Sequence, residues 1–512
     1  INNLSVELTL QAMPVSPCAL NISDQIIFWV DIPNAAPNQL AHKSLNVGES
    51  LQFNFEVQSI SQGVFTWYLD GEVIEGQTGE ELNILNVKPS DAGAYNCVFT
   101  TSCGNVESNS AFVEILQTSV QELIIPHGWS GISSFVLPEN TNFESVFSPV
   151  LNNVIRISDY SGNNYFVPGG VNTLGSWSNV EGYKIKMSGT DYLTIPGTIR
   201  YPFEKITIGQ GWSLIPVNST CVVETAGTFA GLPQIAMIKE VSGVKLFWPA
   251  MGINTLPELF PGKAYAIYNT STSFDFNYPK CSDPNILPTF ESQPTRLNNN
   301  PWSEVTTTPA THVFGFEPAA LFMFEPGDII GAFSSEGICI GYTPIENTRE
   351  PVALSVFVDD VLTSPKDGAL QNESVHFKLF RTSTGEEFGM TVNFSNRAGG
   401  RDVFEENGIS IVDNVEFLAT SVAEVATGQA IAISMYPNPA KEKVELAITS
   451  AGDFEATAEI VSAGGQLVFK ETFYHTGKQT NLTIDLADFP KGVYFMKIVS
   501  EKTLMVEKLI IE

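Results

Sequence analysis

The sequence has few positive charges and no long hydrophobic run. It carries 26 Lys and Arg against 56 Asp and Glu in 512 residues, a formal net charge of -30. Because contacts to phosphate groups need clustered Lys and Arg, we expect no nucleic acid and no anionic lipid surface among the partners. No apolar stretch approaches the roughly 18 residues that a membrane-spanning helix needs, so we also expect no transmembrane segment.

The signatures of common enzyme classes are missing as well. The sequence has no GxSxG, HExxH or P-loop motif, and no GxGxxG that follows a strand pattern. The five histidines have no spacing typical of metal ligands, and each is most simply a surface or packed residue: His42, His127, His312, His376 and His475. We therefore predict that the protein is not an enzyme, although a pair of carboxylates for glycoside hydrolysis cannot be identified from sequence.

One acidic cluster deserves two interpretations. The stretch "VDDVLTSPKDG" contains Asp359, Asp360 and Asp367. Their oxygens could bind calcium, the one cofactor that the sequence suggests. We favour a solvated acidic turn, because one loop supplies fewer than the roughly six to eight oxygen ligands that calcium takes.

The residues that are abundant point to strands. Charged residues make up 16% of the chain and hydrophobic residues 43%, with 40 Gly, 30 Pro and 34 Phe. This composition favours many short strands joined by turns, and the length exceeds what one hydrophobic core organises. We predict an all-β string of β-sandwich modules. The chain opens inside a strand pattern and without a secretory leader, so we expect residues 1–36 to be the end of a truncated β-domain.

Residues 37–117 contain a familiar set of positions. Trp67 lies in the strand pattern "FTWYL", and "DAGAYNC" spans Asp91 to Cys97. These positions resemble the core tryptophan and the tyrosine corner of an immunoglobulin-like domain, which implies a two-sheet sandwich. The strand expected to supply the partner cysteine carries Phe53 and Phe55 instead, so the usual bridge between the sheets cannot form.

The next segment is duplicated. "HGWSGI" at 127–132 recurs as "QGWSLI" at 210–215, and Trp129 and Trp212 are 83 residues apart. We predict two copies of one β-module, at residues 118–200 and 201–282. The pattern resembles a module of secreted Bacteroidetes proteins that has no known activity. The paired tryptophans could stack on sugars, but we favour the interpretation that each anchors a small core.

Four of the six cysteines suggest disulfides, which form in an oxidising compartment. Cys97 and Cys103 flank "VFTTS", and a hairpin there would bring them together. The alternative is that Cys97 is a small buried hydrophobic residue. Cys221 and Cys281 lie near the start and end of the second copy, so a local bridge is plausible. The two cysteines without an obvious partner are Cys18 and Cys339.

The last part of the chain divides into three segments. Residues 283–417 alternate with a period of two between Gly-Asp and Asp-Gly turns, which predicts a β-sandwich or jelly-roll-like domain. Residues 418–433 are small and without periodicity, so we predict a linker. Residues 434–512 contain about six short strand patterns, and "YPNP" before the first of them predicts an extended segment with a turn.

Several separated motifs in residues 434–512 resemble the type A C-terminal sorting domain of the Bacteroidetes type 9 secretion system. They are "YPNP", "GGQLV", "KGVYFMKI" and the closing "EKLIIE", although such domains often end on lysine-rich residues and this chain ends on glutamate. The resemblance assigns the sorting signal to Tyr436, Pro437, Asn438, Pro439, Gly464, Gly465, Gly492, Tyr494, Lys508, Leu509 and Ile510.

That resemblance implies export across the periplasm and outer membrane to the cell surface or the medium. The implied partners are the translocon and an outer-membrane shuttle barrel, which the apolar final strand could contact. We predict a non-catalytic adhesin or stalk that binds a surface glycan or another cell-surface protein. The alternative is the glycan-binding tail of a secreted hydrolase with an upstream catalytic domain, and a role in gliding motility or in the secretion machine is a third.

Overall fold

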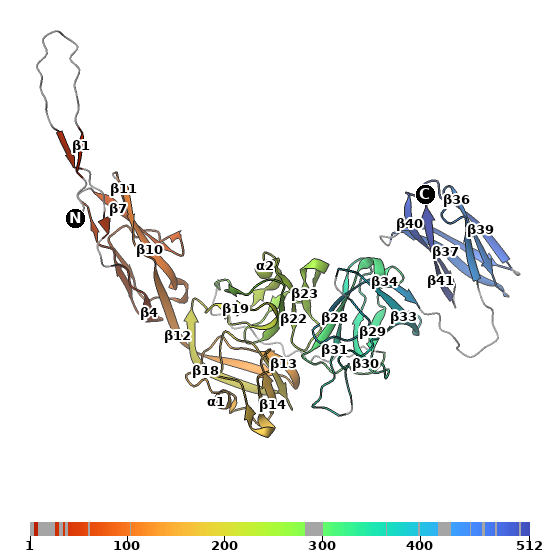
Figure 1. Cartoon of the computed structure of the whole chain (residues 1–512), viewed down its shortest axis with the longest axis horizontal. Helices are drawn as coiled ribbons and strands as arrows, with labels where there is room; N and C mark the ends of the chain where they lie inside the picture. Colours follow the sequence, from red (N-terminus) through yellow and green to blue (C-terminus); the bar gives the residue numbers. More distant parts are fainter. Residues whose placement is uncertain are drawn as a thin grey trace, which may run out of the picture.

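The chain is nearly all β in the computed structural model, with 52% strand and 5% helix, as the sequence predicts. The structure describes the backbone of three short N-terminal strands and then residues 39–59, 62–102, 104–281, 301–364, 366–397, 400–417, 432–450, 452–462, 466–476, 479–500 and 503–512. Within these ranges, no helix is long and apolar enough to cross a membrane. The modules follow one another from the immunoglobulin-like end to the C-terminal end (Figure 1).

The N-terminal strands make two small pairings. β1 (Ser5–Leu8) pairs with β2 (Ile26–Trp29), and β3 (Asn34–Ala35) pairs with β6 (Val57–Gln58) of the following module. The other residues up to 38, Cys18 among them, lie outside the described part of the chain. That residues 1–36 end a longer domain stays a prediction.

The immunoglobulin-like module has two sheets. Its strands are β4 (Lys43–Asn46), β5 (Leu51–Asn54), β7 (Gly63–Leu69), β8 (Glu72–Val73), β9 (Glu81–Ile84), β10 (Gly93–Thr101), β11 (Gly104–Glu107) and the first part of β12 (Ala111–Ile125). β5 pairs with β9, and the other strands form the second sheet. The Tyr95 hydroxyl donates to the Asp91 carbonyl oxygen at 2.6 Å, which is the predicted tyrosine corner. Phe53 stacks on the buried Trp67, with ring centroids 6.3 Å apart.

The predicted Cys97–Cys103 disulfide is wrong. Cys97 is a free thiol, fully buried opposite Trp67. The hairpin of β10 and β11 closes with Thr101 opposite Gly104, and this register puts Ser108 across from Cys97. Burial raises the pKa of the thiol to about 12, so it remains protonated. Cys103 itself lies outside the described residues.

β12 continues without a break into the first duplicated copy. It pairs antiparallel with β18 (Asp191–Tyr201) from Ile115 to Ile125. The expected boundary between residues 117 and 118 therefore lies inside one strand. Because the immunoglobulin-like module and the first copy share a hydrogen-bonded sheet, they are joined by a sheet instead of a linker (Figure 1).

The two copies have the same topology. The first contains β13 (Gly128–Ile132), α1 (Phe143–Phe147), β14 (Val154–Ser158), β15 (Asn164–Phe166), β16 (Val171–Asn172) and β17 (Tyr183–Met187). The second contains β20 (Gly211–Pro216), α2 (Thr225–Phe229), β22 (Ile235–Glu240), β23 (Leu246–Trp248), β24 (Ile253–Asn254) and β26 (Ala264–Asn269). The sheet orders are β13-β17-β14-β15-β16 and β20-β26-β22-β23-β24. The second copy also has two short pairs, β19 (Ile206–Ile208) with β27 (Phe274–Phe276) and β21 (Val223–Glu224) with β25 (Glu258–Leu259).

Residues 301–417, which we call the third module, form one seven-stranded sheet. Its strands are β28 (Thr311–Phe316), β29 (Ile329–Phe333), β30 (Cys339–Pro344), β31 (Val352–Phe357), β32 (His376–Arg381), β33 (Glu386–Phe394) and β34 (Ile409–Phe417), in the order β30-β29-β32-β33-β34-β28-β31. Only β28 and β34 are parallel among these pairs. Gly341 of β30 approaches the Ser355 carbonyl of β31, so the two ends of the sheet meet. This single curled sheet differs from the sandwich or jelly roll expected from the sequence.

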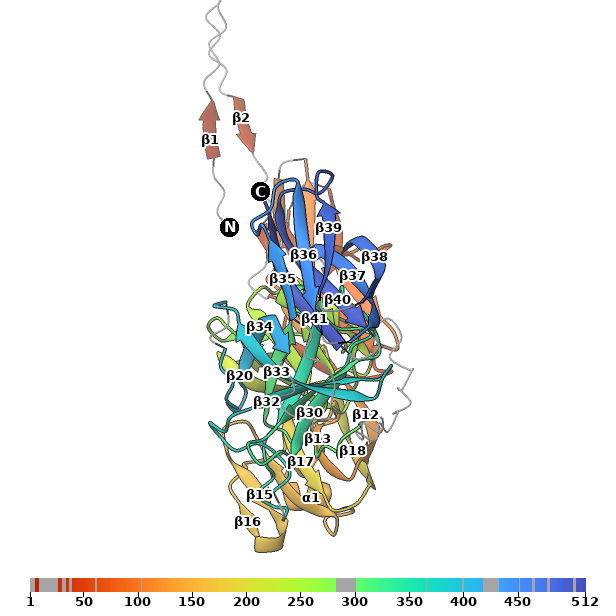
Figure 2. The ribbon, with the colours of Figure 1, turned by 90° about the vertical axis from the view of Figure 1, so that its right-hand side faces the viewer.

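The C-terminal module is a separate sandwich. β35 (Ala432–Tyr436), β36 (Lys443–Thr449) and β39 (Gln479–Asp485) form one sheet, and β38 (Leu467–His475), β37 (Phe454–Ser462), β40 (Gly492–Ser500) and β41 (Thr503–Ile511) form the other. Its own core includes Leu446, Ile460 and Met496. Figure 2, turned by 90° from Figure 1, shows this module in front of the others.

Candidate functional site

The "YPNP" segment lies against the final strand. The Asn438 side chain accepts a hydrogen bond from the Ile510 amide at 2.9 Å and donates to the Lys508 carbonyl oxygen at 2.5 Å. Ala440 continues the contact, because its amide donates to the Ile510 carbonyl and its carbonyl accepts from the Glu512 amide, both at 2.8 Å. We call these contacts of Asn438 and Ala440 with residues 508–512 the terminal clip.

The prolines explain why a side chain is used in the clip. Pro437 and Pro439 have no N–H and cannot donate to a β-ladder. Both peptide bonds that precede them are cis. Asn438 lies between them and bonds with its amide group instead of its backbone, so the edge of β41 is paired despite the two prolines.

The other residues assigned to the sorting signal have different surroundings. Tyr494 is buried, lies opposite Leu509 and donates from its hydroxyl to the Pro490 carbonyl at 2.7 Å. Gly492 lies opposite Ile511 at the end of the same strand pair. Tyr436 is 78% exposed, and Lys508 is also exposed. Gly464 and Gly465, also assigned to the signal, lie outside the described residues.

The final strand divides its apolar side chains between two faces. Leu509 and Ile511 are buried in the core of the sandwich, so they close it and do not face a partner. Val506 and Lys508 alternate with them and face outward. The side chain of Leu504 lies outside the described part of β41.

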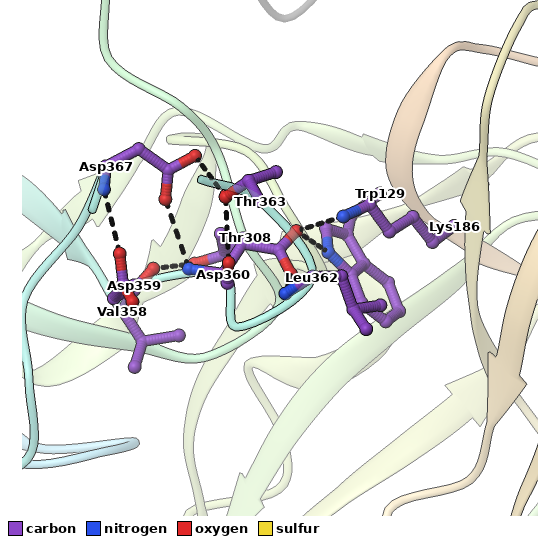
Figure 3. Close-up of polar contacts among 9 residues, drawn as sticks. All are labelled: Trp129, Lys186, Thr308, Val358, Asp359, Asp360, Leu362, Thr363 and Asp367. Carbon is purple, nitrogen blue, oxygen red and sulfur yellow. Dashed lines mark hydrogen bonds and ion pairs between the residues drawn. The ribbon is translucent and has the colours of Figure 1, made fainter. Parts of the chain in front are cut away.

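The first of the paired tryptophans contacts the third module. Trp129 Nε1 donates to Asp360 Oδ2 at 2.7 Å, and Lys186 Nζ reaches the same oxygen at 2.6 Å (Figure 3). The side chains of Lys186 and Asp360 are 9% and 5% exposed. The Lys186 ammonium also lies 5.9 Å from the centroid of the Trp129 ring. A buried ion pair and an indole hydrogen bond therefore converge on one carboxylate.

The second tryptophan makes the corresponding contact at another point of the same module. Trp212 Nε1 donates to the Asn407 carbonyl at 2.9 Å, and the indole stacks on Tyr268. Lys239 lies 5.3 Å above the Trp212 ring and donates from Nζ to Thr311 Oγ1 at 2.6 Å. Burial lowers the pKa of Lys239 to about 7. The interpretation favoured from the sequence, that each tryptophan anchors a small core of its own, is therefore incomplete. Each indole N–H bonds to the third module.

The acidic loop does not form the calcium site considered from sequence. Asp359 accepts from the Asp367 amide at 2.8 Å, and Asp367 accepts from the Asp360 amide at 3.1 Å and from the Thr363 hydroxyl at 2.9 Å (Figure 3). Asp360 Oδ2 accepts hydrogen bonds from Lys186 Nζ and Trp129 Nε1. In the part of the chain that the structure describes, no group of three or more His, Cys, Asp or Glu could hold a metal ion. The carboxylates fix the loop and dock it on the first copy.

The one deeply buried histidine of the third module has a packing role. His312 Nδ1 accepts from the Glu405 amide at 3.0 Å, which leaves the proton on Nε2 to donate to Ser410 Oγ at 2.8 Å. Burial lowers the pKa of His312 to about 4, so the ring stays neutral. Its ring stacks on Phe314 with centroids 4.1 Å apart.

The cysteines of the second copy form the bridge that the sequence suggested. Cys221 and Cys281 are joined by a disulfide with Cα atoms 5.9 Å apart. The bridge ties the loop after β20 to the segment after β27. Cys339 is buried in β30, and its thiol donates to the Gly341 carbonyl at 3.7 Å.

Two families of known domains match the chain. The secretion system C-terminal sorting domain matches residues 434–512, and the immunoglobulin I-set domain matches residues 35–115. These matches confirm both resemblances seen in the sequence. No curated protein matches the chain.

Solved structures that resemble part of the chain include titin domains and tandem immunoglobulin repeats. The titin M4 domain is 22% identical, with 16% of this chain and 92% of that chain covered and a TM-score of 0.15. The tandem immunoglobulin repeats of Dlar are 17% identical, with 17% and 50% covered and a TM-score of 0.16. The titin tandem A164-A165 is 14% identical, with 33% and 97% covered and a TM-score of 0.18. Scores so far below 0.5 say nothing about the chain as a whole.

Proposed function

Because the chain ends in a type 9 secretion-system sorting domain and carries an immunoglobulin I-set domain, we propose that it is a non-catalytic adhesin or stalk exported to the cell surface or the medium. The sorting domain is the address that the outer-membrane shuttle barrel and the translocon read. Residues 39–417 form the adhesin or stalk that acts after export. The observation that carries the proposal is the separate core of residues 434–512, because a self-contained sandwich can be bound as a tag by a partner.

The stalk role is supported by continuous contacts between the modules. The immunoglobulin-like module shares a sheet with the first copy through β12 and β18. Lys280, at the end of the second copy, reaches back to Asp70 at 2.6 Å and to the Ala92 carbonyl at 3.0 Å. Trp129 and Trp212 bind both copies to the third module. Modules locked in this way keep a fixed spacing, which suits a protein that presents its tip away from a surface.

The terminal clip indicates which surface of the sorting domain a shuttle barrel would contact. Leu509 and Ile511 are buried in the core of the sandwich, so a shuttle barrel would contact the exposed Tyr436 and the edge of β41. Beyond the clip, the open edge of β41 offers backbone groups for strand addition. The acidic Glu512 takes part in the clip through its amide, so its position does not depend on a lysine-rich ending.

Export of the full chain tests the proposal. We expect deletion of residues 434–512 to leave the protein in the periplasm, and deletion of residues 508–512 to reduce the exported fraction strongly. Lys508→Ala tests a single side chain of the last strand. Its matched control is Lys470→Ala, because Lys470 lies on the same sheet and already pairs with Glu459 at 2.8 Å. Undiminished export after removal of residues 434–512 would refute the proposal, and undiminished export after removal of 508–512 would dismiss the role of the last strand.

The alternative of a glycan-binding tail is less well supported. Its candidate residues were Trp129 and Trp212, and both indoles are hydrogen-bonded at the boundary with the third module. A glycan array with the full chain separates the two: binding that is lost in Trp129→Phe or Trp212→Phe would favour the tail of a hydrolase. Binding to a cell-surface protein without glycan would favour the adhesin.

A further inference from the structure

Phe322 lies where the third module meets the sorting domain. It follows the 3-10 helix η4 (Pro318–Leu321). Its neighbours Leu321 and Phe324 are buried in the core of the third module. The ring of Phe322 stacks instead on Phe495 of β40, with centroids 4.2 Å apart and ring planes at 23°. Phe322 is only 9% exposed. A residue of the sorting domain therefore supplies the aromatic contact that buries it.

A lysine of the same strand adds a polar contact. Lys497 Nζ donates to the Phe322 carbonyl oxygen at 2.8 Å and lies 6.0 Å from the centroid of its ring. Burial lowers the pKa of Lys497, while the carboxylates of Glu459 and Glu325 raise it and the cation of Arg381 lowers it further. The ammonium is thus drawn out of water and held by a backbone carbonyl and an aromatic face. Such a contact is directional, unlike a chance apolar touch.

The contacts fall on a defined part of one sheet face. Along β40, Val493, Phe495, Lys497 and Val499 alternate with core residues and share the outer face. Phe495 and Lys497, in the middle, meet the third module. Val493 and Val499, at the two ends, are 37% and 38% exposed. The same strand therefore contains both the contact and its internal control.

We propose that the outer face of β40 is a docking surface whose partner is the third module, so that the sorting domain is seated on its own cargo in one orientation. Lys508 lies opposite Phe495 in the strand pairing, and Val506 lies opposite Lys497. The seated module therefore borders the outward side chains of the last strand. This consequence rests on the proposed function: a shuttle reaches the signal from the terminal clip and the open edge of β41, because the third module covers the face of β40.

Hydrogen exchange of the purified full chain tests the seat without any export step. In Phe495→Ala we expect the amides of residues 318–325 to exchange roughly two- to tenfold faster, the range that one aromatic pair gives. Phe322→Ala should accelerate residues 492–500 by a similar factor. The double variant should show no more than either single one, because both remove the same contact. Phe495 and Phe322 lie outside the two cores, so the modules should remain folded.

Val493→Ala is the matched control, because it shortens a side chain on the same face of the same strand but outside the seat. If residues 318–325 exchange equally fast in Phe495→Ala and Val493→Ala, or if the two phenylalanine effects add, the docking surface does not exist. Export of Phe495→Ala is measured separately. We expect normal export, because the shuttle reaches the signal from the terminal clip and the edge of β41; export that falls in Phe495→Ala would overturn this route. Lost export of the chain without residues 434–512 concerns the address itself.

Discussion

Neutralising Asp360 should open the boundary between the first copy and the third module. Asp360 accepts from both Trp129 Nε1 and Lys186 Nζ, and the side chains of the ion pair are 5% and 9% exposed. Breaking a buried pair by removing one charge costs about 3–5 kcal/mol, because the other charge remains buried without compensation. Asn at this position keeps an acceptor for the indole, so we expect the lower end for Asp360→Asn, about 3 kcal/mol.

Native-state hydrogen exchange measures this cost at the boundary itself. A loss of about 3 kcal/mol raises the opening equilibrium about 150-fold, which should appear in the amides of residues 183–187 and 354–360. Adding Lys186→Met to Asp360→Asn should restore part of the loss, because the pair is then neutral on both sides. The double variant should therefore be more stable than the sum of the single effects predicts.

The chain contains a control with a similar trio, in which a glutamate stands in place of the aspartate beside a tryptophan and a lysine. Trp302 Nε1 donates to Glu387 Oε1 at 2.8 Å, and Lys378 lies 3.4 Å from Glu387, but these two charged side chains are 43% and 42% exposed. Glu387→Gln should cost less than about 1 kcal/mol, because an exposed pair is screened by water. If Asp360→Asn and Glu387→Gln change exchange to the same extent, the ion pair does not hold the modules together.

Three further predictions concern other contacts. Asn438→Ala removes two hydrogen bonds of the terminal clip, about 1 kcal/mol each, and should speed exchange of the Ile510 amide without unfolding the sandwich. Replacing Cys221 and Cys281 by serine opens a loop of 60 residues and should lower the stability of the second copy by about 4 kcal/mol in urea. Lys239 has a pKa lowered to about 7 in the folded state, so the unfolded state binds more protons between about pH 7 and its usual 10.5. Stability should therefore rise with pH in that window, and Lys239→Met should abolish the rise.

Much of the fold could be predicted because its signals are local. Alternation with a period of two marks most strands, and the tyrosine corner of Tyr95 needs only the Asp91 carbonyl four residues away. The disulfide of Cys221 and Cys281 lies within one copy, so the repeat itself suggested the pair. The error at Cys97 was also local: the spacing showed a hairpin but not the residues at which it turns.

The functional contacts could not be predicted, because they join residues far apart in the sequence. Trp129 and Asp360 are 231 residues apart, and Asn438 and Ile510 are 72 apart. No periodicity relates such positions, and an indole at the end of a strand is equally compatible with a core, a sugar site or a boundary. The one available signal was the repeat: a tryptophan kept in both copies after glycine indicates a common partner. It does not say that the partner is a third module.

The arrangement of the two copies explains why only one of them needs glycine at two positions. By the repeat, Gly131 corresponds to Leu214 and Gly182 corresponds to Ala264. Gly131 approaches Ala264, where a Cβ would overlap the carbonyl oxygen, and Gly182 approaches Leu214 in turn. Gly182 also lies against Ala264, its own counterpart, where a Cβ would come within 2.8 Å of the Ala264 Cβ.

Such reciprocal contacts are those of a two-fold interface, in which residue i of one copy meets residue j of the other and the reverse also holds. The duplicated segment is therefore built like a symmetric dimer joined in one chain. The two copies are separate segments of one chain, so corresponding positions can carry different residues, as Gly131 and Leu214 do. The third module also meets the two copies at different residues, one at Asp360 and the other at Asn407. Each half of the interface between the copies is close-packed in its own way, with a side chain of the second copy against a glycine of the first.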